Sequence, residues 1–74
     1  ERAAEMVMMG LRLAEGVNGA AFKEEVGAPL ADWLAGPNLE RLLDGGLLFW
    51  RDSYLTASCD GRLVLNAVLA ELLP

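Results

Sequence analysis

Histidine is absent from this sequence, and cysteine occurs once, at Cys59. Because histidine is the commonest metal ligand and the usual general base near neutral pH, its absence argues against most metal and acid–base chemistry. A lone cysteine cannot form a disulfide within the chain, so the composition fits a reducing compartment and we expect a cytoplasmic protein. The sequence therefore predicts a chain with no catalytic, cofactor-binding or metal-binding residues of its own.

Long apolar runs are missing as well, and so is an excess of positive charge. The longest uncharged apolar stretch, residues 63–70, is interrupted by Asn66 and is far shorter than the roughly 20 residues that a membrane-spanning helix needs. We therefore expect no membrane span. The 6 basic and 11 acidic residues give a net charge of −5, and the resulting field repels phosphate groups, so we expect no nucleic acid partner.

Apolar residues, by contrast, are plentiful and make up 54% of the 74 residues. This fraction is typical of a folded core and not of disorder, and the length suffices for one core, so we expect a single domain over residues 1–74. The sequence begins at Glu1 without an initiator methionine, and no basic segment is followed by an apolar one. We therefore expect an end domain of a larger protein, without a secretory signal.

The first part of the sequence has the three- and four-residue apolar spacing of amphipathic helices. We expect a first helix over residues 1–15 that ends at Gly16. Its predicted apolar face consists of Ala3, Met6, Met9, Gly10 and Leu13, followed by Val17. Asn18 is a good N-cap for a second helix, which Gly27 and Pro29 should end. A third helix is expected over residues 38–44, before a pair of glycines.

The apolar period changes after Gly46. Residues 47–50 and 54–57 are short, aromatic-rich runs around a polar turn, which predicts a β-hairpin. Ser58 should cap a last helix, residues 58–73, whose broad apolar surface predicts a place in the centre of the core. The expected fold is mostly α with a small β-hairpin, in the winged-helix-like order helix, helix, helix, hairpin, helix. The predicted core draws on Met9, Leu13, Phe22, Leu42, Leu47, Val64 and Val68.

Four stretches of the sequence together resemble a known family. They are MMGLRL at 8–13 with EGV at 15–17, GLL at 46–48, GRLVLNAVL at 61–69, and LL at 72–73. In this order and spacing they resemble the C-terminal domain of oxygen-independent coproporphyrinogen III oxidases and their haem-chaperone-like relatives. Relatives typically have Thr-Pro before the Gly-Arg pair, whereas this sequence has Ser58 and Cys59. The helix cap is therefore kept, and the proline that suits the first helical position is lost.

The resemblance implies a parent protein of haem biosynthesis with a radical S-adenosylmethionine barrel upstream. A cysteine triad in that barrel holds a 4Fe–4S cluster, and none of the family's catalytic residues falls in this chain. By the same resemblance, this domain is a non-catalytic accessory domain that packs on the barrel and helps to enclose a tetrapyrrole. The alternative is a haem- or protein-binding module of a haem-chaperone-like relative, and the sequence leaves both open.

Three residues are candidates for contacts with the barrel or the substrate. Arg12 could bind a carboxylate through two hydrogen bonds, such as a propionate or an Asp or Glu of the barrel. The favoured interpretation is a surface ion pair with Glu5 or Glu15. Trp50 and Tyr54 could stack on a tetrapyrrole or on the barrel. Because Trp50 lies beside a polar turn, we expect the hairpin, residues 47–57, to expose an apolar patch.

Other residues have simpler interpretations. Trp33 and Phe49 are expected to be buried in the core. Haem ligation by a methionine is conceivable, but core packing is favoured for all three, Met6, Met8 and Met9. Cys59 is expected to be a small, tolerated residue and not a reactive thiol, because Asp60 opposes the lowering of its pKa by the helix N-terminus.

Overall fold

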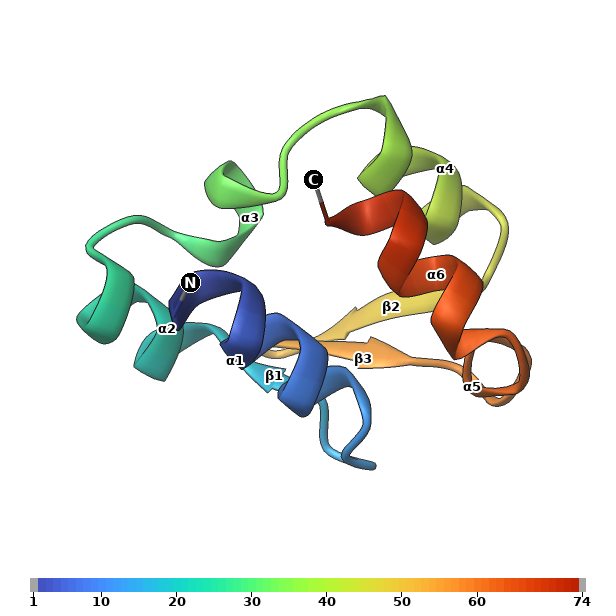
Figure 1. The fold of residues 1–74 in the computed structure, drawn as a ribbon, viewed down its shortest axis with the longest axis horizontal. Helices are drawn as coiled ribbons and strands as arrows, with labels where there is room; N and C mark the ends of the chain where they lie inside the picture. The colour runs from blue at the N-terminus through green and yellow to red at the C-terminus, as the bar shows by residue number, and fades with distance from the viewer. Residues whose placement is uncertain (1, 74) are drawn as a thin grey trace.

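The computed structural model describes residues 2–73. Helices and strands follow one another as α1 (Arg2–Leu11), β1 (Val17–Asn18), α2 (Gly19–Val26), α3 (Leu30–Trp33), α4 (Pro37–Asp44), β2 (Leu48–Arg51), β3 (Tyr54–Ala57), α5 (Cys59–Leu63) and α6 (Leu65–Leu72) (Figure 1). The mostly helical fold and the place of the hairpin are thus confirmed. The short strand β1 and the single-turn helix α3 are additions to the predicted elements.

The strands form an antiparallel sheet in the order β1-β3-β2, so that β1 joins the predicted hairpin along its β3 edge. Val17 pairs with Leu55, and Leu48 pairs with Ala57. Because side chains alternate between the two faces of a strand, these four residues share one face. All four are buried. This face of the sheet is therefore the one that carries the core, and α1 lies along β1 while α6 lies beside the hairpin (Figure 1).

The core is one cluster of fifteen buried apolar residues to which the sheet and the longer helices contribute. Phe22, Leu42 and Val68 belong to it, as predicted, and Leu47 is partly buried against it. The other three predicted core residues are exposed: Met9 by 68%, Leu13 by 55% and Val64 by 45%. That part of the core prediction was wrong.

Met9 and Leu13 were wrongly predicted to be buried because α1 turns another part of its surface toward the core. The buried residues of α1 are Ala3, Val7, Gly10 and Leu11. Ala3 and Gly10 belong to the predicted face, but Val7 and Leu11 are buried in place of Met9 and Leu13. Gly10 lies close against β1, since a Cβ at Gly10 would stand 2.8 Å from Cγ2 of Val17. The helix also ends at Leu11 and not at residue 15, and Glu1 lies outside the described residues.

The last helix was predicted as one element but consists of two, α5 and α6, which meet at Val64. Val64 has φ −121° and ψ 35°, so the helical conformation is interrupted there. Helix α5 contacts β3, whereas α6 contacts α4, and the bend allows one chain segment to reach both. Only Val68, Leu69 and Leu72 of α6 are buried, and Leu63 is 83% exposed, so α6 covers the core and does not lie in its centre.

The predicted caps are present. Asn18 Oδ1 accepts hydrogen bonds from the amides of Ala20 and Ala21, at 3.0 and 3.2 Å. Helix α2 ends at Gly27, which has the left-handed φ of 89°. Ser58 Oγ accepts a hydrogen bond from the amide of Gly61 at 3.1 Å. These caps are short-range contacts, which explains why the sequence predicts them well.

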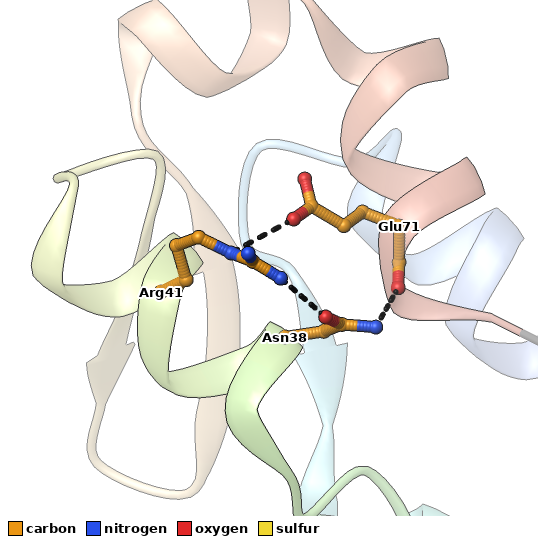
Figure 2. A network of polar contacts seen from close by, with 3 residues as sticks. All are labelled: Asn38, Arg41 and Glu71. Carbon is orange, nitrogen blue, oxygen red and sulfur yellow. Dashed lines mark hydrogen bonds and ion pairs between the residues drawn. The ribbon is translucent and has the colours of Figure 1, made fainter.

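A polar network joins α4 to the C-terminal end of α6 (Figure 2). Asn38 Nδ2 donates a hydrogen bond to the carbonyl oxygen of Glu71 at 2.9 Å. Arg41 donates to Asn38 Oδ1 through Nη2, and its Nε lies 3.0 Å from Oε1 of Glu71. The carbonyl of Glu71 is among those at a helix end that have no partner within the helix. Helix α4 therefore caps α6 from outside.

Candidate functional site

The structure does not bring the three candidate contact residues together. Arg12 lines a hollow between α1 and α6, whereas Trp50 lines one beside α2 and α3. Tyr54 lines a third hollow, between α1 and β1. A site made jointly from these three side chains is therefore ruled out in this fold.

Trp50 borders a shallow hollow of about 350 Å³ between the hairpin turn and helices α2 and α3. Its lining is Gly19, Ala20, Lys23, Pro29, Leu30, Ala31, Trp50, Asp52 and Ser53. The N-terminal amides of α2 are not free to bind an anion, because each already has an acceptor. The amide of Gly19 donates to the carbonyl oxygen of Ser53 at 2.9 Å, and the next two amides donate to Asn18 Oδ1. The hollow can therefore receive an apolar group but offers little polar chemistry.

The hairpin exposes two aromatic side chains, of which only Trp50 was expected to be exposed because of its place beside the polar turn. Trp50 is 38% exposed and Phe49 is 40% exposed. The exposure of Phe49 contradicts its predicted burial, because Phe49 alternates with Leu48 along β2 and lies on the sheet face opposite to the core. Trp33 is half-buried, and its ring centroid lies 5.5 Å from that of Phe22, so Trp33 does pack on the core as predicted.

Tyr54 is half-buried at the end of β3, where it pairs with Asn18 of β1 and Arg51 of β2. The hollow beside it has a volume of about 310 Å³ and includes the exposed side chains of Met9 and Leu13. The lining of this hollow is both apolar and charged, since it also includes Glu5 and Glu15. The surroundings of Tyr54 thus include acidic groups as well as apolar ones.

Arg12 lies just beyond the C-terminal end of α1 and lines a hollow of about 580 Å³. The remaining lining residues are Ala4, Met8, Asn66, Leu69, Ala70 and Leu73. The favoured pairing of Arg12 with Glu5 or Glu15 was wrong, because the ion pairs within residues 2–73 are Arg2 with Glu25 and Arg41 with Glu71. Instead, Arg62 Nη2 donates a hydrogen bond to the carbonyl oxygen of Arg12 at 3.4 Å.

Sequence reasoning missed the proximity of Arg12 and Arg62, and no local signal could have found it. The two residues are 50 positions apart, and Arg62 lies on α5, whose place depends on its packing against the hairpin. Leu63 and Val64 are exposed, although the sequence assigned them to a buried helix. The most exposed large apolar side chains, Leu63, Met9 and Leu13, therefore lie outside the hairpin that was expected to carry the apolar patch.

The sulfur-containing side chains have different surroundings from those expected. Met6 packs partly against the core, but Met8 and Met9 are exposed, so core packing is confirmed for Met6 alone. Cys59 is an exposed free thiol at the first position of α5. Over residues 2–73, no three side chains of His, Cys, Asp or Glu are grouped so that they could hold a metal ion.

Two glycines of the stretches that resemble the family serve close packing. Gly10 approaches Val17, and Gly61 approaches the carbonyl of Leu47 so closely that an added Cβ would collide with it. Gly61 also donates its amide to Ser58, whose Oγ donates in turn to the backbone carbonyl of Gly46. These stretches thus reflect how the helices pack on the sheet, and not a reactive site.

Comparison with curated proteins and with solved structures finds no match. No helix within residues 2–73 is both long enough and apolar enough to cross a membrane. The family model described as the HemN C-terminal domain matches residues 1–64, which include α1 to α5 and the whole sheet. The chain therefore belongs to the HemN C-terminal domain family, the accessory domain of HemN-like proteins.

Proposed function

We propose that this chain is a non-catalytic accessory domain that packs on the barrel of a coproporphyrinogen oxidase-like radical S-adenosylmethionine protein of haem biosynthesis. In this proposal the domain helps to enclose the tetrapyrrole substrate. The barrel holds the 4Fe–4S cluster and S-adenosylmethionine, since such a cluster needs several thiolates and this chain has a single cysteine. A cytoplasmic location belongs to the same proposal and agrees with the lack of an internal disulfide.

The observation that carries the proposal is the exposure of large apolar side chains. Leu63, Met9 and Leu13 each expose more than half of their surface in the described chain. Burying apolar surface stabilises a protein by about 25 cal/mol per Å², and exposed apolar patches mark interaction sites. A partner that covers these side chains would therefore gain binding energy, and the catalytic barrel of a HemN-like protein is the partner that family membership suggests.

The test is to compare the full-length protein with a variant that lacks this domain. We expect the shortened protein to keep its iron content per chain, because the cluster ligands lie in the barrel. We also expect it to bind the porphyrinogen substrate more weakly and to turn it over more slowly. If the shortened protein lost its iron, the proposal that the barrel alone holds the cluster would be wrong. If it bound the substrate as well as the full-length protein does, the proposal that this domain helps to enclose the substrate would be wrong.

A haem-binding module is the second candidate, and the exposed thioethers of Met8 and Met9 are the observation that favours it. Titration of the full-length protein with haem, followed in the visible spectrum, separates the two candidates. A haem-binding module would show saturable binding that Met9→Leu weakens and that Met6→Leu, at a partly buried position, leaves unchanged. An accessory packing domain would show the same spectra for both variants.

A further inference from the structure

One surface of the domain combines exposed apolar groups with positive charge, and we call it the α1–α6 face. It consists of the hollow between α1 and α6, with Met8 and Arg12 on its wall, and of the adjoining end of α5. At that end Arg62 reaches the carbonyl of Arg12, and the next residues, Leu63 and Val64, are exposed. In Figure 1 these segments are the blue helix α1 and the orange-red helices α5 and α6.

The charge of this face is opposite to that of the whole chain. The net charge is −5, yet Arg62 Nη2 lies 3.4 Å from the backbone carbonyl oxygen of Arg12, and neither arginine is part of an ion pair within the described residues. A guanidinium without a partner in the chain attracts an anion. The arginine side chain is also well suited to bidentate contacts with carboxylates. The face is therefore complementary to an apolar surface that carries acidic groups.

We propose that the α1–α6 face is the surface on which the domain docks to the catalytic barrel, through an apolar area with carboxylates opposite Arg12 and Arg62. This inference rests on the proposed function and adds the location and the chemistry of the contact. A symmetric pair with its two-fold axis at this hollow would bring the arginines of both copies together, so a second copy docked in this way is a poor occupant. The acidic charge of the rest of the domain disfavours an anionic lipid surface.

The Trp50 hollow lacks this charge preference. Lys23 and Asp52, which have opposite charges, both line it. It also lies beside α2 and α3, whereas α6 and Arg12 line the other hollow. The two surfaces can therefore be tested separately in the same protein.

The experiment measures how fast single cysteines react with a maleimide in the full-length protein, with the labelled peptides identified by mass spectrometry. Cys59 is first replaced by serine, because its exposed thiol would also react with the maleimide. Leu63→Cys reports on this face, Phe49→Cys reports on the hairpin, and Glu24→Cys on the exposed side of α2 is the reference. A face that is docked about 90% of the time should react about tenfold more slowly than the reference.

We expect slow labelling at Leu63→Cys and reference rates at Phe49→Cys. Replacing Arg12 and Arg62 together by glutamate should restore fast labelling at Leu63→Cys, and so should high salt, because salt screens exposed charge pairs. The matched control Arg51→Glu, at an exposed position of β2, should change neither rate. A melt of each variant monitored by circular dichroism shows that it is folded.

The outcomes separate the inference from the proposed function. Fast labelling at Leu63→Cys with slow labelling at Phe49→Cys would overturn the inference and leave the accessory role intact, with the hairpin as the docking surface. Reference rates at both positions would also overturn the inference, and the comparison with the protein that lacks this domain would then decide whether the accessory role stands. If the protein then sedimented with anionic lipid vesicles and lost this property in Arg12→Glu/Arg62→Glu, the face would bind a membrane and not the barrel.

Discussion

Gly61 lies where α5 crosses the end of the hairpin, and its Cα faces the carbonyl of Leu47. Ser58 is tied to the same place, because its amide donates to the Leu47 carbonyl at 3.0 Å. In an exposed helix, alanine would be preferred over glycine by about 1 kcal/mol. The contact with Leu47 reverses this preference, since a methyl group has no room there.

We therefore predict that Gly61→Ala destabilises the chain by about 1 to 3 kcal/mol, the usual cost of overpacking. The measurement is the free energy of unfolding from denaturant titration. The control is Gly27→Ala, where a Cβ would meet nothing within 4 Å but φ is 89°, so its cost should be limited to about 1 to 2 kcal/mol of backbone strain. A stability gain in Gly61→Ala would show that α5 does not pack on Leu47.

The two leucines that flank Arg12 differ in burial, although both fit a helical apolar pattern. Leu11 is fully buried and Leu13 is mostly exposed. We expect Leu11→Ala to cost about 2 to 5 kcal/mol of unfolding free energy because it leaves a cavity, whereas Leu13→Ala should stay within about 0.5 kcal/mol. Thermal melts of both variants test this, and equal losses would mean that α1 presents another face to the sheet.

At the scale of the elements, the end of α6 depends on α4. Asn38 donates to the carbonyl of Glu71, and Arg41 contacts both Asn38 and the carboxylate of Glu71 (Figure 2). The Arg41 and Glu71 side chains are 63% and 39% exposed, so we expect the ion pair to contribute less than the hydrogen bond that Asn38 makes to the helix end. The amide of Asn38 is thus the main polar link between the two helices.

We predict that Asn38→Ala costs about 0.5 to 1.5 kcal/mol of unfolding free energy, the usual net value of one hydrogen bond. Hydrogen exchange should become faster at the amides of the last turn of α6, while those of α1 keep their protection, because the change is local. Asn38→Asp is the matched control, since it keeps the size of the side chain but removes the donor. Normal protection of α6 in Asn38→Ala would show that Leu72 and its neighbours hold the end without help from α4.

At the scale of the whole molecule, charge separates this domain from nucleic-acid-binding proteins with a similar order of elements. Arg41 on α4 is paired with Glu71, and α4 also carries Glu40 and Asp44. Each phosphate that a protein neutralises contributes about −0.9 to the slope of log K against log salt. Arg12 and Arg62 together could therefore supply a slope of about −2 at most.

We accordingly predict no measurable binding of mixed-sequence duplex DNA or of RNA at physiological salt in a gel-shift assay. The net charge of −5 opposes approach to a polyanion. Tight binding with a steep salt dependence would contradict this prediction and would indicate that α4 acts as a recognition helix in the major groove. A chain with Arg12 and Arg62 replaced by glutamine provides the control for weak contacts at the α1–α6 face.

Local features of the sequence predicted much of the fold. Asn18, Gly27 and Ser58 mark helix ends through contacts that span a few residues, and the aromatic runs around residues 51–53 mark the hairpin. The lack of histidine and the single cysteine limit the chemistry that the chain can perform in any fold. These features are encoded locally, because caps and turns depend on neighbouring residues and composition does not depend on the fold.

The tertiary structure alone decided which side chains are exposed and which lie together. The apolar spacing of α1 fits two stripes that share Ala3 and Gly10, and packing on the rest of the core buries Val7 and Leu11 in place of Met9 and Leu13. The approach of Gly61 to Leu47 places α5, and with it Arg62 beside the carbonyl of Arg12 and Leu63 at an exposed position. Burial and proximity of this kind depend on packing between separate elements, which the periodicity of a single element does not specify.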